Sequence, residues 1–204
     1  MPPEKVNVTR DAGCLDHFLS KLRCQQANRL IQPKYQSGRI LDIGCGTYPL
    51  FLLNTNFAHK YGLDQVISGQ SHAGWQRDGI HFANYNLEKD DTIPFEGDFF
   101  DVITMLAVFE HIEPERLVHQ LKEIRRILKP EGVFIMTTPA GWTDGILTVM
   151  AALRLVSVVE FKEHKDAYTP GKILTLYQKA GFLKERIKMG YFEIFMNIWV
   201  TAHK

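Results

Sequence analysis

The stretch Arg39–Leu50, RILDIGCGTYPL, decides the fold that we expect for this chain. Its first half is mostly apolar and suits a buried strand, which ends in Gly44 and Gly46, two residues that tolerate positive φ and let backbone amides approach a ligand closely. Asp64 lies twenty residues after Gly44, at the end of the next predicted strand, where a carboxylate can accept hydrogen bonds from a ribose diol. The pattern therefore predicts an adenosine-containing ligand at the carboxyl edge of a parallel sheet.

The glycine turn differs from a dinucleotide-binding loop in one respect. The pattern G-x-G-x-x-G would place its third glycine at position 49, where this chain has Pro49. Without that glycine, a helix packs less closely beneath a pyrophosphate. An NAD-dependent oxidoreductase is therefore the less favoured alternative.

Composition favours a single domain over residues 1–204 with a small-molecule partner. The 204 residues can bury a substantial core, and 24 Lys and Arg nearly balance 23 Asp and Glu without a long like-charge block, so we expect no nucleic-acid partner. The N-terminus is polar and the three cysteines are odd in number, which predicts a reduced, cytoplasmic protein without a disulfide framework. No metal is expected, because Glu88, Asp90 and Asp91 lack a histidine or cysteine at ligand spacing.

Short apolar runs alternate with helical patterns, which predicts an α/β fold with a parallel sheet and helices on both faces. Strands are predicted over 39–43, 60–64, 80–84, 101–106 and 133–138. Helices are predicted over 11–32, 113–130 and 169–181. The first helix carries an apolar stripe through Phe18 and Leu22, the second ends at Pro130, and the third begins with a Thr169 cap. Gly190, between two apolar runs, predicts the turn of a final antiparallel hairpin.

In their order, several segments resemble the class I S-adenosylmethionine-dependent methyltransferases. The resemblance runs through LDIGCGT, YGLDQ, NYNLE, IPFEGDFFDVITMLAVFEHI, LKPEGVFIMTTPA and YTPGKILTLYQKAGF, and covers roughly 39–182. It implies a Rossmann-like, seven-stranded, mostly parallel sheet whose seventh strand is antiparallel. It also implies an enzyme that binds S-adenosyl-L-methionine and releases S-adenosyl-L-homocysteine.

The resemblance places the cofactor contacts at the ends of the first four strands. They are Asp42, Gly44, Cys45 and Gly46 beside the methionine part, Asp64 and Gln65 at the ribose, Asn86 and Leu87 at the adenine, and Leu106 beneath the sulfonium. The Cys45 thiol is expected to be inert packing. Tyr48 stands where the family often has a third glycine, and Asn86 where it often has Asp, although an Asn amide can still hydrogen-bond adenine. These departures keep a non-catalytic S-adenosylmethionine-binding protein open as the alternative.

Glu110 and His111 follow the fourth strand, where the family places residues next to the acceptor, and His164 is a second candidate base. Methyl transfer is an in-line displacement, so a base is needed only if the nucleophile carries a proton, and histidine titrates near neutrality. Alternatively, Glu110 and His111 orient the loop or cap the next helix, and His164 is a surface residue. MLAVFEH lacks the Asn/Asp-Pro-Pro-Tyr signature of amine methylation, which favours O-methylation and leaves nitrogen and carbon open.

The segment 142–166 interrupts the route from the fifth strand to the next helix. Its apolar run of about fifteen residues is shorter than the roughly 20 needed to span a bilayer, and it contains Arg154, so no transmembrane helix is expected. Ligands in such sheets bind outside the carboxyl ends of the strands, which predicts an apolar lid over the reactive methyl group. The alternative is that the helix expected over 144–159 is buried in the core or in a homodimer interface.

Overall fold

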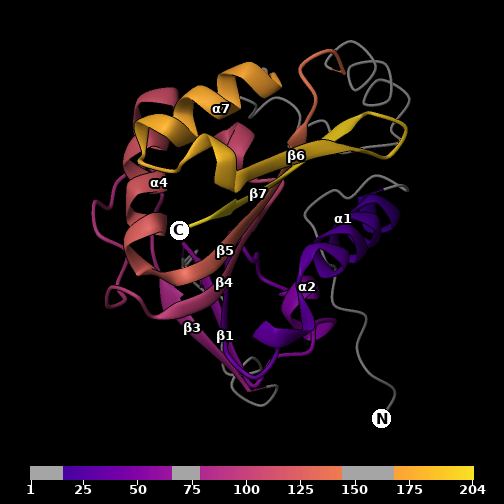
Figure 1. Cartoon of the computed structure of the whole chain (residues 1–204). Coiled ribbons are helices and arrows are strands. Elements are labelled where there is room, and N and C mark those ends of the chain that lie inside the picture. The colour runs from indigo at the N-terminus through magenta and orange to yellow at the C-terminus, as the bar shows by residue number, and fades with distance from the viewer. Residues whose placement is uncertain (1–15, 66–78, 144–167) are drawn as a thin grey trace.

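The computed structural model describes residues 16–65, 79–143 and 168–204. Its helices are α1 (Asp16–Leu30), α2 (Leu50–Leu53), α4 (Pro114–Ile127) and α7 (Pro170–Lys179), with short 3-10 turns at Pro33–Tyr35, Phe109–His111 and Lys184–Arg186. In the view of Figure 1, α4 and α7 lie on one side of the central sheet, and α1 and α2 on the other. Within the described ranges no helix has the length and apolar character needed to cross a membrane.

The sheet has seven strands, which are β1 (Arg39–Ile43), β2 (His59–Asp64), β3 (Ile80–Asn84), β4 (Phe100–Leu106), β5 (Leu128–Pro139), β6 (Ile187–Phe192) and β7 (Asn197–His203). They lie in the order β3-β2-β1-β4-β5-β7-β6, and all neighbours from β3 to β5 pair in parallel, whereas β7 is antiparallel to both β5 and β6. This confirms the predicted seven-stranded, mostly parallel α/β fold with its antiparallel hairpin. The carboxyl ends of β1, β2 and β4 therefore meet at one edge.

Successive side chains of the central strands belong alternately to two separate apolar cores, because successive side chains of a strand point to opposite faces of the sheet. Leu41 and Phe134 belong to the core that includes the buried face of α4 and α7. Their neighbours Ile40 and Val133 belong to the second core, which includes Ala27 of α1. Burial of the strands on both sides fixes the sheet and leaves only its edges for ligands.

Two helix ends test the sequence signals directly. The apolar residues Leu117, Leu121 and Ile124 of α4 are buried. Leu128 already has extended backbone angles and pairs with Phe100, so the predicted end at Pro130 is three residues too late. The predicted cap of α7 is confirmed, because the Thr169 hydroxyl accepts from the Lys172 backbone N–H at 3.4 Å.

The apolar stripe predicted for the first helix is wrong in part. Phe18 is 57% exposed, and the buried residues are instead Cys24 and Ala27 of α1 and Ile31 just beyond its end. Residues 11–15 of the predicted helix lie outside the described ranges. The contact of α1 with the sheet is therefore made by its C-terminal half.

The hairpin is present, but its predicted turn at Gly190 is wrong. Gly190 lies inside β6, where a Cβ would come within 2.8 Å of the Trp199 ring on β7. The turn is made by Glu193, Ile194 and Phe195, whose φ angles are 51°, 54° and 65°. The glycine serves close cross-strand packing, and three larger residues carry the left-handed conformation.

Candidate functional site

The glycine turn after β1 is shaped by two residues in the left-handed region. Gly44 has φ of 74° and donates its N–H to the Leu63 carbonyl at 2.7 Å, and a Cβ at this position would lie 2.3 Å from a Val108 methyl carbon. Gly46 has φ of 69°, and nothing lies within 4 Å of a Cβ built on it. Gly44 therefore permits close packing against the β4 side, whereas Gly46 leaves open space above the turn.

Asp64, at the end of β2, is held beside this turn. Its Oδ2 accepts the Gly46 N–H at 2.7 Å, and its Oδ1 accepts the Gln65 N–H at 2.7 Å. These bonds fix the orientation of the carboxylate at the carboxyl edge of the sheet. The structure thus brings together two elements that the sequence predicted to share one ligand.

The loop after β3 brings Asn86 into the same arrangement. The Asn86 side chain donates to Gln65 Oε1 at 2.9 Å, and its oxygen accepts the Glu88 N–H at 2.9 Å. The Asn86 backbone N–H donates to Asp90 Oδ2 at 2.7 Å. Asn86 is consequently linked to Gln65, the residue that follows Asp64, and the half-buried Leu87 comes next in the loop.

Asp42 lies beneath the glycine turn and not on its surface. Its carboxyl is 5% exposed and accepts a hydrogen bond from the Thr104 hydroxyl at 2.7 Å. Burial raises the pKa of Asp42 from 3.8 to about 7, the Thr104 hydrogen bond opposes that rise, and the charge of Asp64 adds to it. The group can therefore exist in either protonation state near neutrality.

Cys45 contributes packing from within the turn, as expected. The residue is buried, and a Cβ at Gly62 would meet its Sγ at 2.8 Å, so the side chain faces β2. Burial raises the pKa of the Cys45 thiol far above its ordinary value, and the nearby carboxylates Asp42 and Asp64 add to the effect. Such a thiol stays protonated and is a poor nucleophile.

The end of β4 leads directly into the candidate catalytic turn. Leu106 is half-buried, Ala107 has φ of 55°, and the Phe109–His111 turn follows. Glu110 is only 3% exposed and accepts from the Thr138 hydroxyl of β5 at 3.1 Å. That contact is the one expected of a residue that orients the loop. His111 is half-buried, and its role stays a prediction, as does that of His164, which lies outside the described residues.

An apolar cavity of about 280 Å³ lies next to this turn, at the N-terminal ends of α4 and α7. Its lining includes Pro114, Tyr168 and Leu176. The Gly141 N–H donates to the Tyr168 carbonyl at 3.0 Å, so the described residues that precede and follow the segment 144–167 lie next to each other. The predicted lid over 142–166 lies outside the described residues apart from its first two positions.

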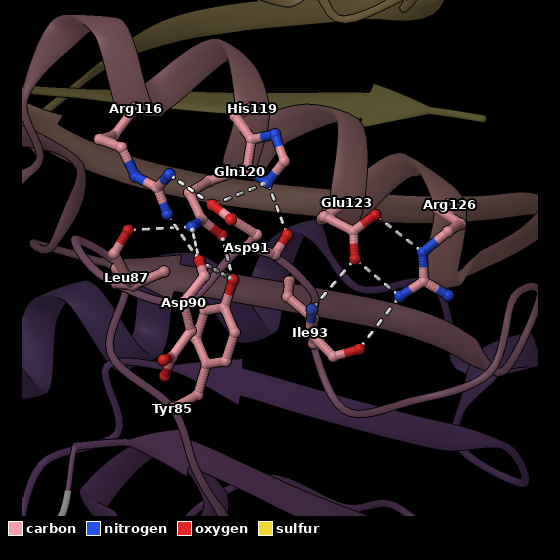
Figure 2. A network of polar contacts seen from close by, with 10 residues as sticks. All are labelled: Tyr85, Leu87, Asp90, Asp91, Ile93, Arg116, His119, Gln120, Glu123 and Arg126. Carbon is pink, nitrogen blue, oxygen red and sulfur yellow. Dashed lines mark hydrogen bonds and ion pairs between the residues drawn. The ribbon is translucent and has the colours of Figure 1, made fainter.

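The sequence reasoning missed a polar network that joins α4 to the loop after β3 (Figure 2). Its centre is Gln120, which has no exposed surface and hydrogen-bonds with Tyr85, Leu87 and Asp90. A signal was present, because Gln120 follows Leu117 by three residues and so falls on the apolar stripe of the helix. A polar residue on a buried stripe needs partners, and these are loop carbonyls.

Residues 15–185 match a family described as a methyltransferase domain. The chain is 24% identical over 139 residues to the carboxy-S-adenosyl-L-methionine synthase of Campylobacter fetus, covering 67% of this chain and 58% of that protein. It is 29% identical over 130 residues to the sterol 4-C-methyltransferase strm-1 of Caenorhabditis elegans, covering 60% and 36%. The chain therefore spans less than two thirds of the length of these curated relatives.

Solved structures agree on the fold. The S-adenosylmethionine-dependent methyltransferase of Mesorhizobium loti superimposes with a TM-score of 0.67 at 17% identity, covering 91% of this chain and all of that one. A methyltransferase of Thermotoga maritima gives 0.66 at 21% identity, covering 92% and 90%. At such identities the likeness concerns the fold, and the acceptor must be argued from this chain.

Proposed function

The chain belongs to the class I S-adenosylmethionine-dependent methyltransferase family, and from this premise we propose that it methylates a small-molecule acceptor, with oxygen as the favoured atom. The observation that carries the proposal is the fixed carboxylate of Asp64 beside the open Gly46 turn. Nitrogen and carbon remain as alternative acceptor atoms, and a non-catalytic binding protein remains the alternative function.

The described residues fit S-adenosyl-L-methionine. The space above Gly46 accommodates a ligand close to the backbone, and the chemistry of Asp64 suits a vicinal diol. Asn86 and Leu87 would meet the adenine, and the Leu106 end of β4 would lie under the reactive end. When bound, the cofactor supplies a methyl group activated on a sulfonium.

The catalytic contribution that we assign to the protein is chiefly alignment. An in-line displacement is accelerated most by holding the nucleophile and the methyl carbon in line with the bond that breaks, and this requires a rigid protein backbone around the site. Glu110, fastened to Thr138, would keep the turn after β4 in place. His111 would act as the base that takes the proton of a hydroxyl acceptor, and His164 is the second candidate for that role.

The acceptor would bind on the side where the chain leaves β5. The Gly141–Tyr168 hydrogen bond closes the base of the segment 144–167 beside the apolar cavity that Tyr168 and Leu176 line. Both features support an acceptor with an apolar body beneath a lid that excludes water from the reaction. The alternative for residues 144–159 is a homodimer interface.

Titration calorimetry with S-adenosyl-L-methionine and S-adenosyl-L-homocysteine tests the binding half of the proposal. The parent should bind both, and Asp64→Ala should weaken both by on the order of 1.5 to 3 kcal/mol through loss of charge-assisted hydrogen bonds. Glu131→Ala is the matched control, because Glu131 is an exposed carboxylate that pairs with Arg186 away from the turn. Isotherms that do not change in Asp64→Ala would contradict the assignment.

Turnover is tested separately, with S-adenosyl-L-methionine labelled in its methyl group. Incubation with a small-molecule extract should transfer label to an acceptor whose molecular mass rises by one methylene. Cofactor binding without any labelled product would favour the non-catalytic alternative. Binding of NAD in place of S-adenosyl-L-methionine would favour an oxidoreductase.

A further inference from the structure

Gln120 is a completely buried amide on α4 that faces the loop following β3. Its Nε2 donates to the Leu87 carbonyl at 2.9 Å and to the Asp90 carbonyl at 3.1 Å, and its Oε1 lies 3.1 Å from the Tyr85 hydroxyl. Figure 2 shows these contacts converging from the helix onto one stretch of loop. A single side chain therefore holds three points between positions 85 and 90.

The hydrogen-bonding capacity of this amide matches the loop. A glutamine side chain has two N–H donors, and both are used on carbonyl groups, while its oxygen accepts from Tyr85. The Tyr85 hydroxyl also lies 2.8 Å from the Asp90 carbonyl, so its one proton is shared between two acceptors. An apolar side chain of the same size would remove both of these donors. The Asp90 carbonyl would keep its contacts with Tyr85 and Arg116, whereas the carbonyl of the half-buried Leu87 would lose its bond to Gln120.

The same stretch of loop carries the residues that we assign to the adenine. The Leu87 carbonyl held by Gln120 follows Asn86 directly, and the Asn86 side chain extends to Gln65, beside Asp64. Gln120 of α4 thus holds the loop backbone on the side that faces the helix, while the Asn86 side chain extends toward Gln65 at the carboxyl edge of the sheet. A shift of the backbone at Leu87 would displace Asn86 with it.

Further contacts from Glu113 and Arg116 attach this loop to the start of α4. Glu88 Oε1 accepts the N–H of Glu113, the residue before the helix, at 2.9 Å. Arg116 donates to the Asp90 carbonyl at 2.6 Å and pairs with Asp91 at 2.8 Å. The Arg116 contacts are exposed, whereas the Gln120 side chain has no exposed surface, so we expect the buried amide to contribute more than Arg116 to fixing the loop.

We propose that Gln120 is a positioning residue for cofactor recognition: it sets the loop that presents Asn86 and Leu87 to the adenine ring. The identity of the ligand rests on the proposed function. Gln120 itself does not touch the ligand in this scheme. It acts through the Leu87 and Asp90 carbonyls and through Tyr85, and its loss would loosen recognition of the base more than binding of the ribose at Asp64.

The chain offers a matched control one turn further along the same helix. Glu123 accepts the Ile93 N–H at 3.0 Å, and its partner Arg126 donates to the carbonyls of Ile93 and Phe95 at 3.0 and 2.9 Å. This second clamp also joins α4 to the segment after β3, as Figure 2 shows, but it lies beyond Asn86 and Leu87. Its removal should destabilise the fold without changing recognition of the base.

The experiment compares Gln120→Met and Glu123→Met with the parent by calorimetric titration and thermal unfolding. The probes are S-adenosyl-L-homocysteine and S-inosyl-L-homocysteine, in which a carbonyl oxygen replaces the amino group of the base. Gln120→Met should weaken the adenine compound at least about tenfold and reduce the preference for it over the inosine compound. Glu123→Met should keep the affinity and the preference of the parent, although both variants unfold at lower temperature.

The outcomes separate the two hypotheses. A parent that binds neither compound contradicts the proposed function. A parent that binds both equally, or a folded Gln120→Met that retains the affinity and preference of the parent, overturns the positioning role while leaving the cofactor assignment intact. If Gln120→Met does not fold, Tyr85→Phe decides, because it removes only the shared hydroxyl: a reduced preference supports the proposal and an unchanged one overturns it.

Discussion

Replacing Asp42 by asparagine should make the stability of the protein less dependent on pH. The Asp42 carboxyl lies 5% exposed beneath the glycine turn, and burial raises its pKa from 3.8 to about 7 despite the hydrogen bond from Thr104. An asparagine side chain has nearly the same shape and stays neutral at every relevant pH. Its oxygen can still accept from Thr104, so Asp42→Asn removes the ionisable group with little change in packing.

The magnitude follows from the difference between the two pKa values. A shift of about 3 units, at about 1.4 kcal/mol per unit, means that ionised Asp42 costs the folded state about 4 kcal/mol. Below about pH 4 the group is protonated in both states and contributes nothing. Between about pH 4 and 7 the unfolded chain ionises while the folded one retains its proton, so the parent loses stability as pH rises, and above about pH 7 the loss is constant.

Urea unfolding of the parent and Asp42→Asn at a series of pH values measures this effect. The advantage of the variant in free energy of unfolding should grow by about 2 to 3 kcal/mol between about pH 5 and pH 8. Comparing the two proteins at each pH cancels the contributions of all other groups. A difference that stays constant over this range would show that Asp42 has an ordinary pKa in the folded protein and would refute the reasoning.

Two further predictions concern residues in the left-handed region. Gly44→Ala should unfold at a markedly lower temperature and lose S-adenosyl-L-homocysteine binding, because its Cβ would lie 2.3 Å from Val108. Gly46→Ala has open space around its Cβ and should lose only about 1 to 2 kcal/mol of stability. Equal melting temperatures of the two variants would contradict this prediction. Ile194→Gly should raise the free energy of unfolding by about 1 kcal/mol in urea titrations, because Ile194 is 89% exposed and is a β-branched residue at φ of 54°. A loss of stability would show that the Ile194 side chain makes contacts that outweigh the backbone strain.

The proximity of the glycine turn and Asp64 could be predicted from sequence because the signals for it are local. Gly44 and Gly46 follow a strand, and the spacing to Asp64 is set by one crossover, so strand ends and turn chemistry suffice to place them together. The parallel pairing of β1 with β2 then brings Asp64 to the turn without any further information. The Gly46–Asp64 hydrogen bond is the direct result.

The errors arose where a residue type has more than one structural use. Gly190 predicts a turn from sequence, but in the structure it permits the close approach of Trp199. The turn is made by Glu193, Ile194 and Phe195, residue types that do not indicate a left-handed conformation. The sequence does not indicate the role of Gln120, because its partners include backbone carbonyls of a distant loop. The structural role of this buried glutamine becomes evident only from the packing of α4 on that loop.

The residues that we propose for the cofactor and the segment that we propose for the acceptor are held by different elements of the fold. The contacts of Gly46, Asp64 and Asn86 depend on β1, β2, β3 and α4. The residues that flank the segment 144–167 are instead held by β5 and the C-terminal hairpin. Gly141 donates its N–H to the Tyr168 carbonyl, and the Ala140 N–H donates to the Met196 carbonyl at 2.8 Å. Glu110 is one of the described residues that join the two sides, because it lies on the turn after β4 and accepts a hydrogen bond from Thr138 of β5. Under the proposed function, changes within 144–167 should alter the choice of acceptor without altering cofactor affinity, and a change at Glu110 should affect both.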